Sequence, residues 1–405
     1  MRKTIVMAAG WLLAATSQAQ THGPTPGHTL GSALEQAWSR HPQAQVFNAR
    51  EMEAKARTEL AAGLTPTPPS MSLSNVSDRL NAATGKDAWE LEVALPMWLP
   101  GQRAARGREA DSAQADVAAR RTALRLQLAA EVREAWWALA GARNALDLAT
   151  HRAAVAKTLQ ADVQRRLRAG ELARIEANLA DLEQLTAESE ALEAQAALRQ
   201  SEQIYRTLTG ADAPALLAQE AEPTAPTATT PHPQLIAAQA LAQLAQARLG
   251  VSQQTGRDAP ELALRWVRDR GDTNAAYADS VGIKLTVPLG SAARLRENSS
   301  AALAESLQAD AELTLTQQRL ELDVARAQRD AQTTQLQLTM AQERLVFTND
   351  ILRLSEKAFA LGESDLASLL RARAGTFEAQ ASLNRHRTAR AASLSRLNQS
   401  MGVMP

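Results

Sequence analysis

The stretch DAWELEVALPMWLPGQRAAR, residues 87–106, joins an alternating segment to a basic one. Apolar side chains alternate with Glu90 and Glu92, so a β-strand here has one apolar face and one face that carries carboxylates. Pro96 ends the alternation, and after Pro100 no proline follows until residue 214. The pattern therefore predicts an amphipathic strand attached to the start of a long helix.

The composition limits the classes of protein that fit. The chain has 405 residues, a formal net charge of zero and no cysteine, so disulfides and thiolate metal sites are excluded. Apolar residues make up 45% but aromatic residues only 3%, which favours long helices and coiled coils over one large globular core. The six histidines are scattered, and the sequence has none of the common catalytic or nucleotide-binding motifs. We therefore predict that the protein is not an enzyme and has no cofactor and no metal site.

Residues 1–19 have the features of a signal peptide. Arg2 and Lys3 precede an apolar core that is too short to span a bilayer, and Ser17 to Ala19 form a small-x-small cleavage site. No cysteine follows the cut, so an acylated lipoprotein anchor is not expected. No later run of about 18 apolar residues predicts a transmembrane helix. The mature chain is expected to be secreted, periplasmic or inserted as a β-barrel.

The chain contains an internal duplication. Three landmarks recur at a separation of 191 or 192 residues, and together they indicate a repeated unit of about 190 residues. They are the HPQ motifs at 41–43 and 232–234, the glycines Gly170 and Gly362, and the glycines Gly210 and Gly402.

The landmarks divide the mature chain into two units and a linker. The first unit is expected at 20–210, a linker rich in proline and threonine at 211–231, and the second unit at 232–402. Each unit should contain a helix, a β-hairpin, a long helix and a shorter helix. The expected ranges of the last three are about 70–95, 104–169 and 172–208 in the first unit and about 260–288, 293–361 and 364–400 in the second.

The long helices carry coiled-coil seams. Apolar residues recur at alternating spacings of four and three, for example at Leu128, Val132, Ala135 and Leu139. A helix over 104–169 would be about 100 Å long, which exceeds the diameter of a globular domain. Gly170 and Gly362 are expected to end the two long helices at turns, after which the shorter helices return.

The two hairpins have the length and pattern of membrane strands. Strands of about nine residues with one apolar and one polar face suit a tilted β-barrel strand, although an amphipathic hairpin packed on a soluble helix would look the same locally. Four strands cannot close a barrel, and open edges are not viable in lipid. Three chains would supply twelve strands, so we predict a homotrimer. The candidate lumen residues are Glu90, Glu92, Arg265 and Lys284, and the candidate aromatic belt is Trp89, Trp98 and Trp266.

The order of these parts resembles the TolC family of outer membrane efflux proteins. The segments that carry the resemblance are LPMWLPGQRAAR, EVREAWWALAGARNALDLA, RAGELARIEANLADLEQL and ALGESDLASLLRARA, and the first is most similar to the CzcC-like branch that serves heavy-metal resistance. The resemblance implies a trimeric channel in which a 12-stranded β-barrel in the outer membrane continues as an α-helical periplasmic tunnel. It also implies an inner-membrane RND pump and a periplasmic adaptor as partners, with no nucleic acid.

The resemblance further implies an acidic constriction at the tips of the helical hairpins. Six residues after the turn glycines Gly170 and Gly362, this chain has Glu176 in the first unit and Ser368 in the second. Nine residues after Gly362 it has Arg371, where an aspartate would be expected, so the acidic ring of the family is altered. The remaining acidic candidates are Glu363 and Asp365, and a plain alternative is that all these groups are solvated charges at helix ends.

The expected fold is mainly α with a small β part, built as a duplicated unit of long coiled-coil helices and β-hairpins. The expected function is that of a passive conduit in the cell outer membrane, with a periplasmic extension, for export of small toxic solutes that include heavy-metal cations. Two alternatives remain open: the outer membrane outlet of a type I protein secretion system, and a soluble periplasmic coiled-coil scaffold.

Overall fold

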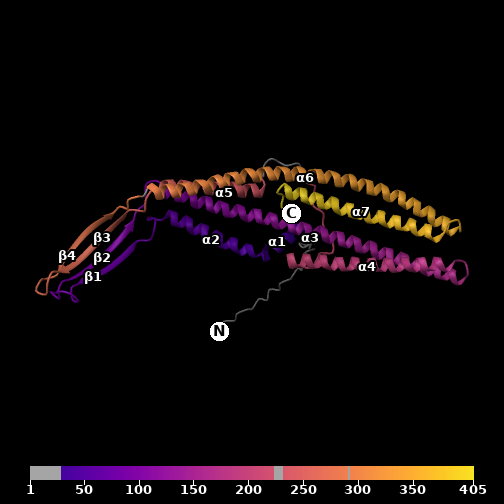
Figure 1. The fold of residues 1–405 in the computed structure, drawn as a ribbon, viewed down its shortest axis with the longest axis horizontal. Coiled ribbons are helices and arrows are strands. Elements are labelled where there is room, and N and C mark those ends of the chain that lie inside the picture. The colour runs from indigo at the N-terminus through magenta and orange to yellow at the C-terminus, as the bar shows by residue number, and fades with distance from the viewer. Residues whose placement is uncertain (1–28, 223–230, 291) are drawn as a thin grey trace, which may run out of the picture.

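A computed structural model describes residues 29–222, 231–290 and 292–405. The expected signal peptide, residues 1–19, lies outside the described residues, as do residues 223–230 of the expected linker. The described chain is elongated, with a small β-sheet at one end and the turns of two helical hairpins at the other (Figure 1).

The elements occur in the same order twice. The first unit contains α1 (Leu30–Arg40), α2 (Pro42–Ala62), β1 (Ser70–Ser77), β2 (Asp87–Pro96), α3 (Gln102–Arg168) and α4 (Arg174–Thr209). The second contains α5 (Pro233–Gln254), β3 (Glu261–Arg270), β4 (Ala278–Thr286), α6 (Ala292–Ala360) and α7 (Leu366–Ser400). In the described part of the chain α1 has no counterpart in the second unit. The predicted fold class, mainly α with a small β part, is confirmed.

The two HPQ motifs start equivalent helices. The ring of His41 accepts a hydrogen bond from the Gln43 amide at 3.3 Å, and the ring of His232 accepts one from the Gln234 amide at 3.1 Å. Proline follows each histidine in the first helical turn, where its missing N–H costs nothing. Both histidines are therefore caps of helix N-termini, at α2 and α5.

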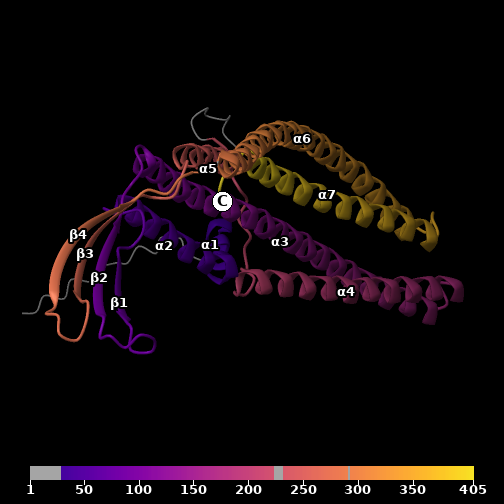
Figure 2. The same ribbon diagram turned by 60° about the vertical axis from the view of Figure 1, so that its left-hand side comes forward.

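The long helices α3 and α6 contain 67 and 69 residues, which corresponds to about 100 Å each. Each runs from the sheet to the opposite end of the molecule and returns there as the shorter helix α4 or α7 (Figure 2). Gly170 and Gly362 sit at the two turns with φ of 79° and 75°. This left-handed conformation favours glycine and closes both turns with the same backbone hydrogen bonds.

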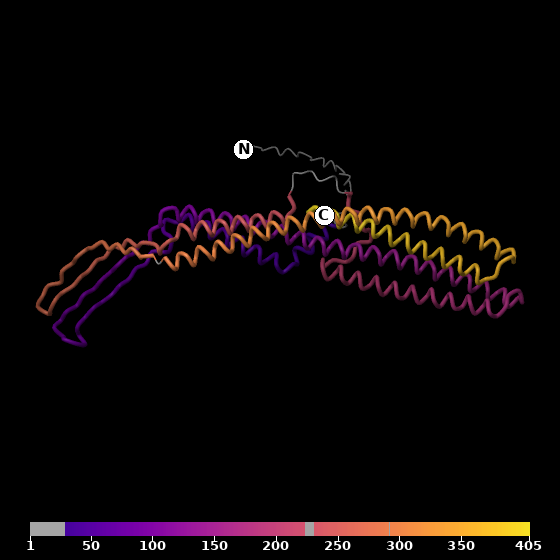
Figure 3. The backbone as a smooth tube through the Cα atoms, turned by 45° about the horizontal axis from the view of Figure 1, so that its top comes forward, coloured from indigo at the N-terminus to yellow at the C-terminus, as the bar shows by residue number. Residues whose placement is uncertain are grey.

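Helix α3 forms the centre of the described chain. It packs against α2 and α4 of its own unit and against α5 and α7 of the other unit. The side chains of Leu126, Leu128, Val132, Trp136 and Leu139 on α3 are fully buried or nearly so. Among the described residues the equivalent helix α6 packs mainly against α5 and α7, so much of its surface is open. Figure 3 shows α6 and α7 as an outer hairpin along the side of α3.

Candidate functional site

The sheet joins the two units. Its four strands are antiparallel in the order β1-β2-β3-β4, and the units meet where β2 pairs with β3. Leu91 lies opposite Trp266 in this pair, and Glu92 lies opposite Arg265. Strands β1 and β4 are the edges and have no further strand partner among the described residues.

One face of the sheet is apolar and exposed. Because side chains alternate along each strand, the register places apolar residues of all four strands in common rows. Val281 and Ile283 on this face are 71% and 79% exposed, although they are large aliphatic residues. The rows are Met71–Val93–Leu264–Ile283, Leu73–Leu91–Trp266–Val281 and Leu95–Leu262–Leu285. An exposed apolar face of this extent indicates a surface that binds protein or lipid.

The opposite face is polar. The structure brings the four predicted lumen residues together here: an Arg265 guanidinium nitrogen lies 2.6 Å from a Glu90 carboxylate oxygen, and the Lys284 ammonium lies 3.2 Å from a Glu92 oxygen. Each carboxylate has one cationic partner, so the set carries no net charge. Serine side chains of β1 extend the same face, because Ser72 and Ser74 lie opposite Glu92 and Glu90.

The three predicted belt tryptophans lie in different surroundings. Trp89 and Trp266 are on the apolar face and are 43% and 37% exposed. Trp98 lies beyond the end of β2 and is partly buried, and its indole N–H donates to the Gly63 carbonyl at 3.1 Å. Trp98 therefore sits at the junction between the sheet and the helices, apart from the other two.

Each helical hairpin tip contains one carboxylate that caps the returning helix. At the start of α4, a Glu176 carboxylate oxygen accepts the Ala173 amide at 3.0 Å. At the start of α7, an Asp365 carboxylate oxygen accepts the Ser368 amide at 2.9 Å. Both tips therefore use a carboxylate that accepts a backbone amide. In α7 the acid, Asp365, is the N-cap residue, whereas in α4 the acid, Glu176, is the third helical residue.

The other constriction candidates lie at the same tips. Arg371 donates to the Ser368 hydroxyl at 3.0 Å and, among the described residues, forms no ion pair. Glu363 follows the turn glycine, and its amide closes the turn on the Ala358 carbonyl. Leu366 and Leu369 of α7 pack against Leu159 and Val163 of α3, so the tips of both units lie together at one end of the molecule (Figure 1).

The cap at Asp365 should depend on pH. The pKa of the Asp365 carboxyl lies below its ordinary value of 3.8, chiefly because the Ser368 side chain hydrogen-bonds to the carboxylate. A lowered folded-state pKa means that the carboxylate stabilises the tip above pH 3.8 and that this stabilisation is lost as the pH falls through the lower folded value. We expect faster amide exchange in residues 366–369, corrected for intrinsic rates, between pH 5 and 3. The Asp365→Asn variant should lack this pH response, and an identical response in it would contradict the assignment.

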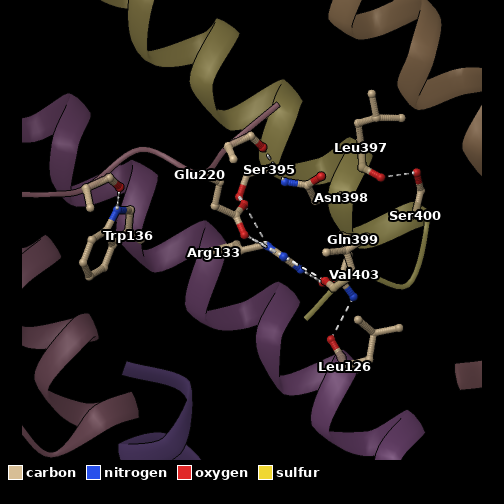
Figure 4. Close-up of polar contacts among 12 residues, drawn as sticks. Leu126, Arg133, Trp136, Glu220, Ser395, Leu397, Asn398, Gln399, Ser400 and Val403 are labelled. Carbon is tan, nitrogen blue, oxygen red and sulfur yellow. Dashed lines mark hydrogen bonds and ion pairs between the residues drawn. The ribbon is translucent and has the colours of Figure 1, made fainter. Parts of the chain in front are cut away.

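A polar cluster clamps the two units together, and sequence patterns missed it (Figure 4). Arg133 of α3 donates to both carboxylate oxygens of Glu220, and its other donors reach Gln399 and the Val403 carbonyl near the C-terminus. Glu220 also accepts from Ser395 of α7. Glu220 falls in the range expected to be a linker, 211–231, and nothing in its sequence context indicates a buried partner.

No group of three or more potential metal ligands occurs among the described residues. In the same part of the chain, no helix is both long enough and apolar enough to cross a membrane.

The sequence of the second unit matches the family described as outer membrane efflux protein, over residues 227–403. No curated protein matches the chain at a significant level.

Solved structures match almost the whole chain. CusC matches with a TM-score of 0.76 and 16% identity, over 98% of this chain and 99% of CusC. VceC from Vibrio cholerae matches with a TM-score of 0.74 and 19% identity, over 92% of this chain and 96% of VceC. CmeC from Campylobacter jejuni matches with a TM-score of 0.74 and 16% identity, over 92% of this chain and 85% of CmeC.

The fold is the one that these outer membrane channels share. The resemblance to the TolC family of outer membrane efflux proteins is confirmed, since the second unit matches the family and the whole chain shares the fold. The expected localisation in the cell outer membrane agrees with the description of the family and with that of VceC.

Proposed function

We propose that this protein is the outer membrane channel of a tripartite efflux system of the RND type and serves as a passive conduit. Its partners would be a periplasmic adaptor and an inner-membrane pump that supplies the energy. The exported cargo would be small toxic solutes. Heavy-metal cations are the first cargo to test, because residues 95–106 resemble the CzcC-like branch.

The observation that carries this proposal is the two-faced sheet with open edges. Its exposed apolar face suits lipid, and its opposite face, with Glu90 and Glu92 paired to cations, suits a water-filled lumen. In lipid the unpaired edges β1 and β4 need partner strands, because no water satisfies their backbone groups. Three copies with four strands each would close a barrel of twelve strands.

The open surface of α6 supports a homotrimer. Leu159 of α3 is 8% exposed because it packs against α7, whereas Ile351, its equivalent on α6, is 55% exposed. The internal duplication makes α6 the equivalent of α3, which is also covered by α5 and α7 of the other unit. In a trimer the corresponding cover of α6 would come from α2 and α4 of a neighbouring copy. Exposed apolar residues on the two surfaces suit this contact: Met340, Phe347 and Leu354 on α6 with Leu361 directly after it, and Ile175, Leu182, Leu185 and Leu192 on α4.

In such a trimer the hairpin tips would meet at the periplasmic end of the tunnel. We assign the constriction to the tip residues Glu176, Glu363, Asp365, Ser368 and Arg371, with Gly170 and Gly362 at the turns. Glu176 and Asp365 also cap α4 and α7. A movement of these helices that opens the constriction would therefore move the residues that line it. The lumen set Glu90, Glu92, Arg265 and Lys284 is neutral, so selectivity would reside in the pump.

The test of this function compares two adjacent positions on β4. A lysine at Val281 would place a charge on the apolar face, where a cation costs up to about 2–4 kcal/mol, depending on its depth in the bilayer. A lysine at Ser280 would face the lumen, where substitutions are tolerated. We expect Val281→Lys to reduce strongly the amount of trimer in the outer membrane fraction, and Ser280→Lys to insert and conduct in planar bilayers. Equal insertion of the two variants, or recovery of the unmodified protein as a monomer without detergent, would refute the proposal.

A further inference from the structure

The apolar face of the sheet ends in two arginines near the loops. Along β3, Arg268 and Arg270 follow Trp266 at intervals of two residues, so they point to the same face, roughly 7 and 13 Å farther along the strand. Arg268 lies opposite Trp89 on β2, and Arg270 lies opposite Asp87. At the helical end the chain continues through Met97, Pro260 and Val287, which carry no charge. On β4, Asp279 lies opposite Arg268 on the same face. The face therefore has a charged border of two arginines and two aspartates, at one end only.

The two guanidinium groups are held by an aromatic ring. Both stack on Tyr277, with guanidinium carbons 5.1 and 4.9 Å from the ring centroid for Arg268 and Arg270. The Tyr277 hydroxyl donates to Asp87 at 2.9 Å, which fixes the ring. The arginines are thus ordered side by side in a geometry that loses little freedom when an anion binds.

Their hydrogen-bond donors are largely unused. Within the described residues neither arginine forms an ion pair. The Nε of Arg270 is buried without a hydrogen-bond partner, so an external anion would meet the terminal guanidinium nitrogens and not Nε. Asp87, the register partner of Arg270, instead accepts from the Asn75 amide at 2.8 Å and from Tyr277. A guanidinium presents several donors in a plane that matches two oxygens of a phosphate. The pair therefore has donors left for an external anion.

The depth of the two arginines in the membrane indicates the source of that anion. A charge on the lipid face is costly near the middle of a bilayer but costs little at its surface, so the arginines belong at the level of the headgroups. Trp89 beside Arg268 suits the same level, since indoles concentrate at membrane interfaces. With the helices in the periplasm, the loop end of the sheet faces the outer leaflet.

We propose that Arg268 and Arg270, held by Tyr277, bind the phosphate groups of phosphorylated lipids in the outer leaflet of the outer membrane. The inference rests on the proposed function, which places the sheet in that membrane. A basic residue at an anionic lipid surface strengthens binding about fivefold, so the pair should contribute at least about an order of magnitude.

The test uses purified trimer in phosphatidylcholine nanodiscs that contain either bis-phosphorylated lipid A or its dephosphorylated form. Native mass spectrometry would measure the lipid A retained on each trimer. We expect the unmodified protein to retain the phosphorylated form about tenfold more strongly, and the variant Arg268→Gln/Arg270→Gln to lose this preference. Arg294→Gln/Arg296→Gln, which removes two exposed arginines at the helical side of the sheet, is the matched control and should keep the preference.

Three results would overturn the inference: equal retention of the two lipid forms, an unchanged preference in the double variant, or full displacement of the lipid by millimolar inorganic phosphate, which would indicate a site for free anions. The same samples are tested for conductance in planar bilayers. Trimers that conduct but retain both lipid forms equally would overturn only this inference, whereas failure to insert would overturn the proposed function as well.

Discussion

Replacing Arg133 by alanine is expected to lower the free energy of unfolding by about 3–5 kcal/mol, the usual cost of removing one partner from a buried ion pair. The side chains of Arg133 and Glu220 are only 3% and 10% exposed, and their closest nitrogen and oxygen atoms are 2.7 Å apart. Without Arg133, the Glu220 carboxylate would remain buried beside Ser395 with no counter-charge.

The loss should be larger than that of one contact because Arg133 joins three parts of the chain. Its donors hold Glu220 of the connecting segment and the carbonyl of Val403 near the C-terminus, at 3.0 Å for the latter. Nearby, the Trp136 indole N–H donates to the Ala218 carbonyl at 3.2 Å and fixes the same segment on α3. Removal of Arg133 would therefore loosen the contact between the two units.

Two variants serve as controls for Arg133. Arg57→Ala breaks an exposed pair with Glu53 and should cost at most about 0.5 kcal/mol. The double replacement Arg133→Met/Glu220→Leu removes both charges together and should recover most of the stability. Denaturant unfolding of the detergent-solubilised protein, followed by circular dichroism, measures all three. A cost below about 1 kcal/mol for Arg133→Ala would show that the clamp contributes little.

Replacing Gly402 by alanine should cost about 2–5 kcal/mol, which combines left-handed backbone strain with overpacking. Gly402 has a φ of 77° at the end of α7. A Cβ there would lie 2.7 Å from Cδ of Pro233 and 3.2 Å from Cα of His232. These atoms belong to the start of α5 and cannot move without shifting that helix.

Two other glycines allow the cost of backbone strain to be measured apart from the cost of the steric clash. Gly210, the repeat equivalent of Gly402, has a φ of 76°, but a Cβ there meets only the flexible Arg40 side chain. Gly362 has a φ of 75° and open space around it. Alanine at Gly362 should therefore cost only the backbone strain, about 1–2 kcal/mol, and alanine at Gly210 slightly more. Equal losses of thermal stability at all three positions would contradict the predicted contact of Gly402 with α5.

Sequence patterns predicted the fold class because the apolar spacing of helices and strands is local. The alternation around Glu90 and Glu92 defines the faces of β2, and the seam on α3 defines a packed side. They did not indicate that β2 pairs with β3 or that Arg133 meets Glu220. Periodicity shows which face of an element is buried but not which distant element covers it.

The candidate site was predictable to a similar degree. Glu90, Glu92, Arg265 and Lys284 could be assigned to one face from alternation alone, while their pairing depends on the register between units. Trp98 was grouped with Trp89 and Trp266, yet it bonds to the Gly63 carbonyl at the sheet junction, a contact across 35 residues that no pattern encodes. The capping contacts of Glu176 and Asp365 follow helix-start rules and could have been found from their positions.

The exchanged caps at the hairpin turns have a consequence for any protein that docks there. In an assembly of three chains, ends capped by Glu176 would alternate around the ring with ends capped by Asp365. The capping side chains of the rim would then repeat every 120°, whereas the backbone of the hairpin tips nearly repeats every 60°. A docking partner would have to present two different contact surfaces in turn, or engage only every second end.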